Sequence, residues 1–423
     1  MTVTVANLSK HDTLSRRYSN YDAREGLLRY GIDSKFLCWT KPLGDPRFVQ
    51  QAQAERGRKL IPFFTKLGRK TGNLNGFYRN ASAFTKLSFY QEADLLHYHI
   101  VHDEYLSVHD WLQIAKNKPV VWTWHDPYML NGHCIYSLGC DRFETGCQKC
   151  PHLDYFFPIE RDRSAKNLQE KIAAVQKIDP LVIVASEYMQ ELVARSQYPK
   201  SLRITQIPFG TELPASLSQE EAKAALGIPQ ENIVLGFRAN PSPYKGMDLI
   251  LFALRELSRR YPKLPLTIIT FEHTECCTGL SSSWQVMDAG WVHGDAIATY
   301  YAAMDYFLMP SRAEAFGMMG IESMSAGAMP LVTHGTSLSS VVASPDLGLA
   351  CEHTPTAYFE MLEEALMTKR SNPLTRAACM QYARQKYSLD RYCQNMAAAY
   401  EEELAYYAHK NKKAGFNERI QRS

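Results

Sequence analysis

The sequence predicts an α/β protein with two Rossmann-like lobes. Short apolar runs typical of buried strands alternate with longer segments typical of helices along most of the chain. The length of 423 residues and the 45% hydrophobic content also suffice for two domains of about 200 residues each. Each lobe is therefore expected to hold a parallel sheet.

Composition excludes several classes of protein. The formal net charge of +3 and the pI of 8.2 are too mild to indicate nucleic acid as a partner. Residues 1–7 are too short and too strand-like for a signal peptide, and no run approaches the roughly 18 apolar residues of a membrane span. We therefore expect a cytoplasmic protein whose ten cysteines are reduced.

The first lobe follows from strand, helix, strand units. Strands are expected at 2–7, 34–39, 94–99, 119–124 and 181–185, with a helix at 18–30 that ends at Gly31. The second lobe repeats the alternation, with strands at 233–237, 266–270, 305–309 and 329–333. A helix is expected from 389 to about 409. This alternation is typical of parallel sheets.

Two carboxylates, Glu314 and Glu322, lie eight residues apart around Gly317. Glu314 is predicted in the loop after a strand, and Glu322 in a helix that begins after Gly317. The first-turn N–H groups of that helix favour an anion. The arrangement suits a ligand with a diphosphate and several hydroxyls, as in nucleotide sugars. The alternative is an exposed loop charge and a solvated helix residue.

Two cations, Arg238 and Lys245, bracket a proline-containing loop after the strand 233–237. Arginine binds phosphate bidentately and lysine acts as a point charge, so the pair can stabilise a departing diphosphate. The alternative is that both are ordinary surface cations.

His125 follows the predicted strand 119–124. This position places it at the carboxyl end of the first sheet, the edge where ligands bind in such folds. A histidine there could contact substrate or act as a general base. A buried, hydrogen-bonded structural histidine is the alternative.

Four cysteines, Cys134, Cys140, Cys147 and Cys150, fall within seventeen residues. In a reducing compartment four thiolates suit tetrahedral Zn²⁺ without an open position. The sequence therefore predicts a structural zinc site in the loop 132–152, in which His133 or His152 could replace one ligand. Reduced cysteines without metal, an iron–sulfur cluster and a redox disulfide are the alternatives.

The segment 51–93 is basic and rich in aromatic residues. It holds eight Lys or Arg residues against two Glu residues, which gives a local net charge of +6. It could attach to an anionic membrane surface, where lipid-linked acceptors reside. Alternatively it is a solvated segment whose aromatic side chains pack onto the first lobe.

The run from Glu314-Ala315-Phe316-Gly317 through Glu322 to Ala326-Gly327-Ala328-Met329-Pro330 resembles the Glu-x7-Glu signature of retaining glycosyltransferases of family four. The resemblance implies the GT-B fold, with two Rossmann-like lobes facing each other across a cleft. It implies that Glu314 is catalytic and engages the donor sugar, with the donor also held by the segment Phe316, Gly317, Met318 and Met319 and by Glu322. It further implies that Arg238 and Lys245 hold the donor phosphates and that His125 is a catalytic-site substrate contact.

The region of His125 and the cysteine run resembles bacterial exopolysaccharide glycosyltransferases of the colanic-acid type. The resemblance implies domains at 1–213 and 214–398 and a carboxyl-terminal helix, 399–423, that returns to the first domain. It implies transfer of a sugar from a nucleoside diphosphate donor to a lipid-linked saccharide acceptor in surface polysaccharide synthesis, without a catalytic cofactor and at the inner membrane face. A sugar-nucleotide epimerase, a non-catalytic partner subunit and a zinc-stabilised module that binds an anionic polymer are the alternatives.

Overall fold

The computed structural model describes residues 2–12, 20–40, 42–52, 55–74, 76–211, 217–290, 292 and 295–422. The chain forms two compact units, Met1–Pro208 with Leu389–Ser423, and Phe209–Ser388. The boundary expected near residue 213 lies outside the described residues. At the carboxyl end, residues from Leu389 onward group with the first unit, whereas the sequence-based range for the second domain extends to 398.

The strands of the first unit form one parallel sheet in the order β3-β2-β1-β4-β5-β6-β7. The strands are β1 (Val3–Ser9), β2 (Ile32–Cys38), β3 (Val49–Gln51), β4 (Leu95–Tyr98), β5 (Val120–Trp124), β6 (Leu181–Val184) and β7 (Ile204–Gln206). β4, β5 and β6 are buried along their whole length. Their continuous apolar runs are typical of parallel strands covered on both faces.

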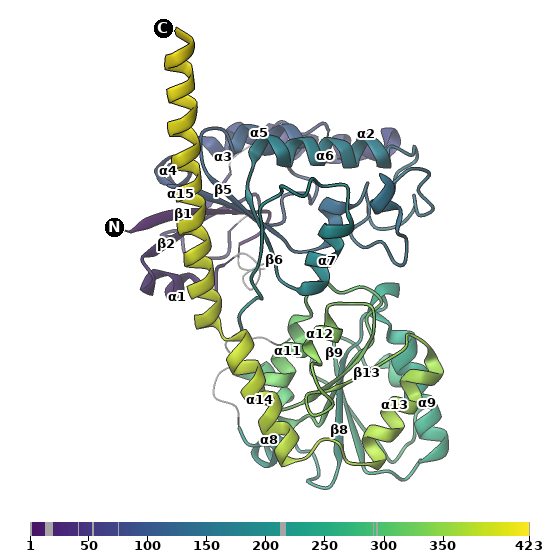
Figure 1. The fold of residues 1–423 in the computed structure, drawn as a ribbon. Helices are drawn as coiled ribbons and strands as arrows, with labels where there is room; N and C mark the ends of the chain where they lie inside the picture. Colours follow the sequence, from purple (N-terminus) through teal and green to yellow (C-terminus); the bar gives the residue numbers. More distant parts are fainter. Residues whose placement is uncertain are drawn as a thin grey trace. The chain divides into compact units, whose positions relative to one another are not determined.

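The helices of the first unit are α1 (Arg24–Arg29), α2 (Glu55–Thr71), α3 (Ala81–Thr85), α4 (Ser88–Glu92), α5 (Val108–Ile114), α6 (Ser164–Ile178), α7 (Glu187–Arg195) and α15 (Leu389–Arg422). α5 and α6 lie side by side, and α15 packs against α1 and β5 (Figure 1). Among the described helices, none has the length and apolar character that a bilayer span requires.

The second unit holds a parallel sheet in the order β10-β9-β8-β11-β12-β13. Its strands are β8 (Ile233–Arg238), β9 (Leu266–Phe271), β10 (Gln285–Asp288), β11 (Tyr306–Met309), β12 (Met329–Thr333) and β13 (Leu349–Cys351). Its helices are α8 (Gln219–Ala225), α9 (Met247–Arg260), α10 (Asp295–Ala303), α11 (Met318–Ser325), α12 (Leu338–Val341), α13 (Pro355–Met367) and α14 (Pro373–Tyr387).

Alternate strand residues of the second unit supply two cores. Leu235 and Phe237 of β8 face α9 and α13, which pack on each other, whereas Val234 faces the α8 and α10 side. Figure 1 shows α9 and α13 on one face of this sheet and α8, α11 and α14 on the other. Side chains that alternate along a strand point to opposite faces, so one run of apolar residues fills both layers.

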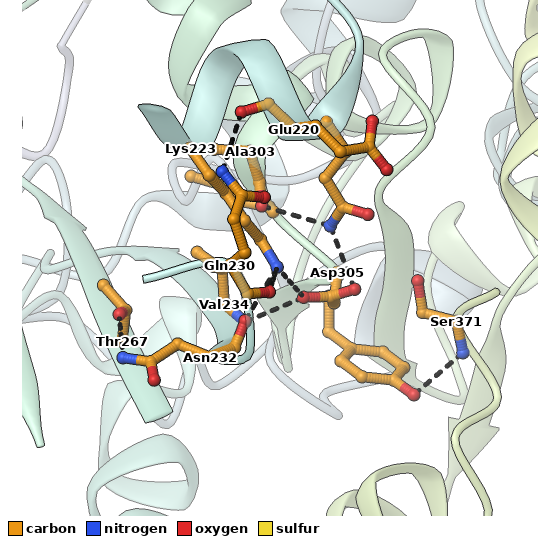
Figure 2. A network of polar contacts seen from close by, with 12 residues as sticks. Glu220, Lys223, Gln230, Asn232, Val234, Thr267, Ala303, Asp305 and Ser371 are labelled. Atoms are coloured by element: carbon orange, nitrogen blue, oxygen red, sulfur yellow. Dashed lines mark hydrogen bonds and ion pairs between the residues drawn. The ribbon is translucent and has the colours of Figure 1, made fainter. Parts of the chain in front are cut away.

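A polar network ties β8, β11 and α8 together (Figure 2). The Asp305 carboxylate accepts hydrogen bonds from the Val234 backbone N–H at 2.8 Å and from Gln219 Nε2 at 3.0 Å. Lys223 Nζ lies 3.9 Å from the same carboxylate and donates to the carbonyl oxygen of Asn232 at 2.8 Å. Asp305 immediately precedes β11, so the network fixes the amino-terminal end of the strands.

Candidate functional site

The candidate site of the second unit lies where its strand order reverses. β8 and β11 are neighbours, with β9 and β10 on one side and β12 and β13 on the other. The loops after two such strands diverge and leave a crevice at the carboxyl ends, where α/β folds bind ligands. Lys245 lies in the loop after β8 and Glu314 in the loop after β11.

Lys245 and Glu314 form an ion pair. The distance from Lys245 Nζ to Glu314 Oε2 is 2.7 Å, and the two side chains are 22% and 12% exposed. The loops are also joined through their backbones, because the Arg312 N–H donates to the Tyr244 carbonyl at 2.8 Å. Gly246 has φ +69°, and a Cβ there would lie 1.9 Å from the Pro310 carbonyl oxygen. Lys245 and Glu314, which the sequence singled out separately, are therefore brought together by closely packed loops.

Arg238 has a different partner. Its Nε and Nη2 donate to Glu272 Oε1 at 2.9 and 2.5 Å. Glu272 follows β9, the strand beside β8, and has a backbone φ of +93°. Glu272 was not predicted from the sequence, although its position two residues after the strand expected at 266–270 was a usable signal.

The amino terminus of α11 faces the same loops. Gly317 caps the helix with φ +90°, and a Cβ there would lie 2.3 Å from Leu338 Cδ2, so glycine is required. The helix begins at Met318 and has no side-chain cap and no acidic residue in its first turn. The N–H groups of Met318 and Met319 therefore belong to a helix terminus that favours an anion.

Glu322 and Phe316 are both buried, in different settings. Glu322 is 1% exposed and accepts a hydrogen bond from Tyr301 OH at 3.3 Å. The Phe316 ring packs edge-on against Phe209 and Tyr387, with ring centroids 5.0 and 5.9 Å away. Phe316 is thus a packing residue through its side chain, and only its backbone remains for a donor contact.

The candidate site of the first unit lies at the corresponding reversal between β1 and β4. His125 follows β5, His99 follows β4 by one residue, and Asn7 lies in β1. His125 Nε2 is 3.1 Å from His99 Nδ1, and His99 Nε2 is 3.1 Å from Asn7 Oδ1. The three side chains thus form a chain of hydrogen bonds from one strand end to the next.

The orientation of the Asn7 amide determines which ring nitrogen of His99 and of His125 carries the proton. Asn7 Nδ2 donates to the Lys35 carbonyl at 3.2 Å, so its Oδ1 faces His99. His99 Nε2 must then donate, which makes His99 Nδ1 the acceptor and His125 Nε2 the donor. In this tautomer His125 Nδ1 carries the lone pair.

Burial keeps these histidines neutral. It lowers the pKa of His125 to about 4 and the pKa of His99 well below 6.5. His125 is therefore a weak proton carrier near neutral pH and acts more readily as a hydrogen-bond acceptor. Its predicted role as a substrate contact fits this chemistry better than the role of general base.

Residues distant in sequence support the histidine chain. His97 Nδ1 lies 2.7 Å from Tyr400 OH of α15, and His97 Nε2 lies 2.7 Å from Thr123 Oγ1 of β5. Tyr400 OH also accepts a hydrogen bond from Asn20 Nδ2 at 2.8 Å. The carboxyl-terminal helix is thus part of the structure that holds these residues.

The structure does not support the predicted zinc site. Cys134, Cys140, Cys147 and Cys150 form no disulfide. Among the described residues, no group of three or more His, Cys, Asp or Glu side chains is arranged to hold a metal ion. Burial, together with the neighbouring cysteines, raises the pKa of Cys134 to about 12. The loop is held in part by the Cys150 N–H, which donates to Asp162 Oδ2 at 2.9 Å.

The basic segment 51–93 contains the amphipathic helix α2. Leu60 and Phe63 of this helix are 46% and 60% exposed. Lys59, Lys66 and Lys70 are exposed on the same helix. Other aromatic residues of the segment are buried, among them Tyr78 and Phe84. The segment therefore both packs onto the unit and presents an apolar and cationic surface.

Residues 218–386 match the family model described as Glycosyl transferases group 1. All of the matched residues lie in the second unit. The match contains the loops with Lys245 and Glu314 and the whole of α11, so it includes the candidate site of the second unit. The predicted resemblance to these glycosyltransferases is confirmed.

One curated relative of this chain is WcaC of Escherichia coli (strain K12), named as a colanic acid biosynthesis glycosyl transferase. The two are 32% identical over 127 residues, which cover 28% of this chain and 30% of WcaC. The chain thus spans less than a third of that relative's length.

Two solved structures resemble nearly the whole chain. Sucrose-phosphate synthase from Thermosynechococcus elongatus is 17% identical with a TM-score of 0.69, and the match covers 96% of this chain and 100% of that one. HepE of Anabaena, solved in complex with UDP and glucose, is 15% identical with a TM-score of 0.61, and the match covers 95% and 100%. These likenesses confirm the predicted α/β class with two Rossmann-like domains of the GT-B fold.

Proposed function

We propose that this protein is a retaining glycosyltransferase that moves a sugar from a nucleoside diphosphate onto a lipid-linked saccharide acceptor in surface polysaccharide synthesis. The observation that carries the proposal is the Lys245–Glu314 pair at the strand-order reversal of the second unit. A cation and a carboxylate beside a helix amino terminus match a ligand with phosphates and sugar hydroxyls. The family match to residues 218–386 supports the same reading.

In the proposed reaction, the bond between the anomeric carbon and the diphosphate oxygen breaks and a bond to the acceptor hydroxyl oxygen forms. The acceptor proton passes to the leaving diphosphate, so no separate base is needed. Lys245, Arg238 and the first-turn N–H groups of α11 receive the charge that develops on the diphosphate. Lys245 has three donors and can hold a phosphate oxygen while it keeps its contact with Glu314.

The carboxylates have separate roles in this proposal. Glu314, in the loop beside Lys245, accepts hydrogen bonds from hydroxyls of the donor sugar. Glu322, which is buried beside Tyr301, accepts hydrogen bonds from the ribose hydroxyls. His125 offers its Nδ1 lone pair to a sugar hydroxyl in the tautomer that Asn7 and His99 impose.

We also propose that α2 brings the protein to an anionic membrane surface, where lipid-linked acceptors reside. The exposed Leu60 and Phe63 would insert at the interface, while exposed lysines of the same helix meet anionic headgroups. Flotation with anionic vesicles tests this role. The variant Phe63→Ser/Lys66→Glu should lose flotation, and Lys116→Glu, an exposed lysine on the same unit, should keep it. Equal flotation with zwitterionic vesicles would contradict the proposal.

A donor screen tests the enzymatic proposal. Uridine diphosphate sugars are the first donors to try, because HepE was solved with UDP and glucose. Donor consumption with saccharide-lipid acceptors should be detectable for the wild type and fall about a hundredfold for Glu322→Gln. Glu360→Gln, an exposed residue of α13, serves as the matched control.

The stereochemistry of the product and the fate of the donor complete the test. An α-linked product from an α-linked donor supports retention, whereas inversion contradicts it. Donor binding without transfer to any acceptor, or conversion of the donor sugar into an epimer, would overturn the transferase proposal in favour of a binding subunit or an epimerase.

A further inference from the structure

A pocket of about 560 Å³ opens on the first unit. Its lining residues do not include Asn7, His99 or His125. It is formed by the end of α2, the residues around Lys149, and the segment that enters α6. We call it the α6 pocket. Its volume is in the range of small-ligand sites in proteins.

The lining of the α6 pocket is strongly cationic. Four basic side chains, those of Lys149, Arg161, Arg163 and Lys166, line it together with one acidic side chain, that of Asp162. Both Asp162 oxygens already accept backbone hydrogen bonds, one from Ser164 at 3.0 Å and one from Cys150 at 2.9 Å.

The basic residues of the pocket fall into two groups. Arg163 is held by Glu170, with distances of 2.9 and 2.7 Å. Within the part of the chain that the structure describes, Lys149, Arg161 and Lys166 form no ion pair, and all three are exposed. Three unpaired cations around one concavity attract a multiply charged anion more strongly than three separated surface charges.

Hydrogen bonds and a close backbone contact join the segments around the α6 pocket. The Glu160 N–H donates to the Arg69 carbonyl at 2.9 Å, and Asn167 Nδ2 donates to the Gly72 carbonyl at 2.8 Å. Gly72 has φ +76°, and a Cβ there would lie 2.2 Å from the Arg161 carbonyl oxygen. The end of α2 is thus fixed against the segment that carries two of the cations, which limits the ordering required on binding.

The amino terminus of α6 adds to the positive potential. The helix has 15 residues, no acidic residue in its first turn and no side-chain bond at its N-cap residue, Arg163. Ser164 lies at this terminus and is 1% exposed at the pocket. Asp162 already accepts the Ser164 N–H, so it is the helix dipole that adds to the attraction of an anion to the three cations.

We propose that the α6 pocket binds the phosphate or diphosphate group of a ligand, at a site separate from the donor site of the second unit. The first-unit location suits an acceptor whose sugar is attached to lipid through a diphosphate, and this choice of source rests on the proposed function. A free phosphate compound has the same chemistry and is the other source.

Hydrogen–deuterium exchange localises the binding on the full-length protein. Pyrophosphate should slow exchange in peptides that cover 147–150 and 161–167. In Arg161→Glu/Lys166→Glu this protection should require about tenfold or more pyrophosphate, because charge-assisted contacts are lost. Lys177→Glu, at the other end of α6, should behave as the wild type. Both variants change exposed side chains, and thermal unfolding checks that they are folded.

Separate peptides distinguish this inference from the proposed function. If pyrophosphate protects 314–322 but not 147–167, or protects 147–167 equally in the charge-reversed variant, the α6 pocket is not a phosphate site, while the donor site stands. If 147–167 is protected but no donor is ever bound at 314–322, the pocket stands and the proposed function fails.

A second exchange experiment, with vesicles, identifies the source of the phosphate group. Vesicles of zwitterionic lipid with polyprenyl diphosphate, compared with plain vesicles, should protect 147–167 if the acceptor supplies the group. Protection by free pyrophosphate alone supports the phosphate site and assigns it to a soluble phosphate compound.

Discussion

His99 Nδ1 and His125 Nε2 lie 3.1 Å apart, and this contact determines which nitrogen of His125 carries the proton. His99 is itself oriented by Asn7, whose amide is fixed by the Lys35 carbonyl. A buried asparagine in β1 thereby controls the tautomer of a histidine that follows β5. His99 and Asn7 are positioning residues for His125, because they act through its ring.

The first prediction concerns this positioning role. His99→Leu should lower kcat about tenfold or more with little change in donor KM, because His125 loses the acceptor that selects its tautomer. His99→Gln should retain more activity, since its side-chain oxygen can still accept from His125 Nε2. Equal losses in both variants would show that only packing matters at this position. His109→Gln, an exposed histidine of the same unit, is the control.

The second prediction concerns acid stability. The folded-state pKa of His125 is about 4, below the usual 6.5, because the ring is buried. Below pH 6.5 the histidine is protonated in the unfolded chain but stays neutral in the folded chain. The free energy of unfolding is therefore highest above pH 6.5 and declines as the pH falls toward 4. Each such histidine contributes up to about 1.4 kcal/mol per pH unit in this window.

Thermal unfolding between pH 7 and 5 measures this effect. The decline in Tm should be shallower in His97→Gln, because burial also lowers the pKa of His97. His109→Gln should show the wild-type slope. A Tm that does not change between pH 6.5 and 5 would exclude buried neutral histidines as the cause of acid sensitivity.

Features encoded within one local segment were accessible from the sequence. The strand ahead of Glu314, the glycine turn at Gly317 and the short helix with Glu322 follow from apolar runs and turn residues. The position of Lys245 after another apolar run placed it at the same sheet edge. Local pattern and the rule for parallel strand ends were therefore sufficient to place Lys245 and Glu314 each in a loop after a strand of the second unit.

Features that depend on which strands are neighbours were not accessible. The partner of Arg238 is Glu272, which is near only because β8 pairs with β9. The contact between His97 and Tyr400 joins residues 303 positions apart. The zinc prediction shows the same limit, because cysteine spacing does not determine whether the side chains converge on one point.

The third prediction separates the two members of the donor-site pair. Lys245→Ala should weaken UDP binding about tenfold or more, because a cation facing the phosphates is lost and Glu314 is left unpaired. Glu314→Gln should leave UDP binding unchanged or tighter, because the carboxylate no longer competes for Lys245, while sugar transfer falls about a hundredfold. Calorimetric titration with UDP, set beside transfer rates, measures both effects. Weaker UDP binding in Glu314→Gln would contradict its role as a sugar contact.

The fourth prediction concerns metal removal. Lys245, Arg238 and the amino terminus of α11 can receive the diphosphate charge in the proposed mechanism, so transfer should persist in excess EDTA. The rate should stay within about twofold of the untreated enzyme, a small change beside the tenfold expected for a lost charge contact. Complete loss of sugar transfer, with recovery on addition of Mg²⁺ or Mn²⁺, would show that a metal ion stabilises the diphosphate charge in place of these side chains.

The last prediction tests the network at the other end of the second sheet. Asp305→Ala removes the acceptor of the Val234 N–H and of Gln219, and takes a carboxylate away from Lys223, which is 6% exposed. Buried donors left without an acceptor cost about 1–3 kcal/mol, so the unfolding transition of the second unit should move to lower temperature.

Calorimetry measures that transition, and Glu231→Ala, which removes an exposed carboxylate next to the network, provides the control. Because Asp305 lies at the amino-terminal ends of the strands, UDP affinity at low temperature should stay the same. A change in affinity without loss of stability would show that the network acts on the site rather than on the fold.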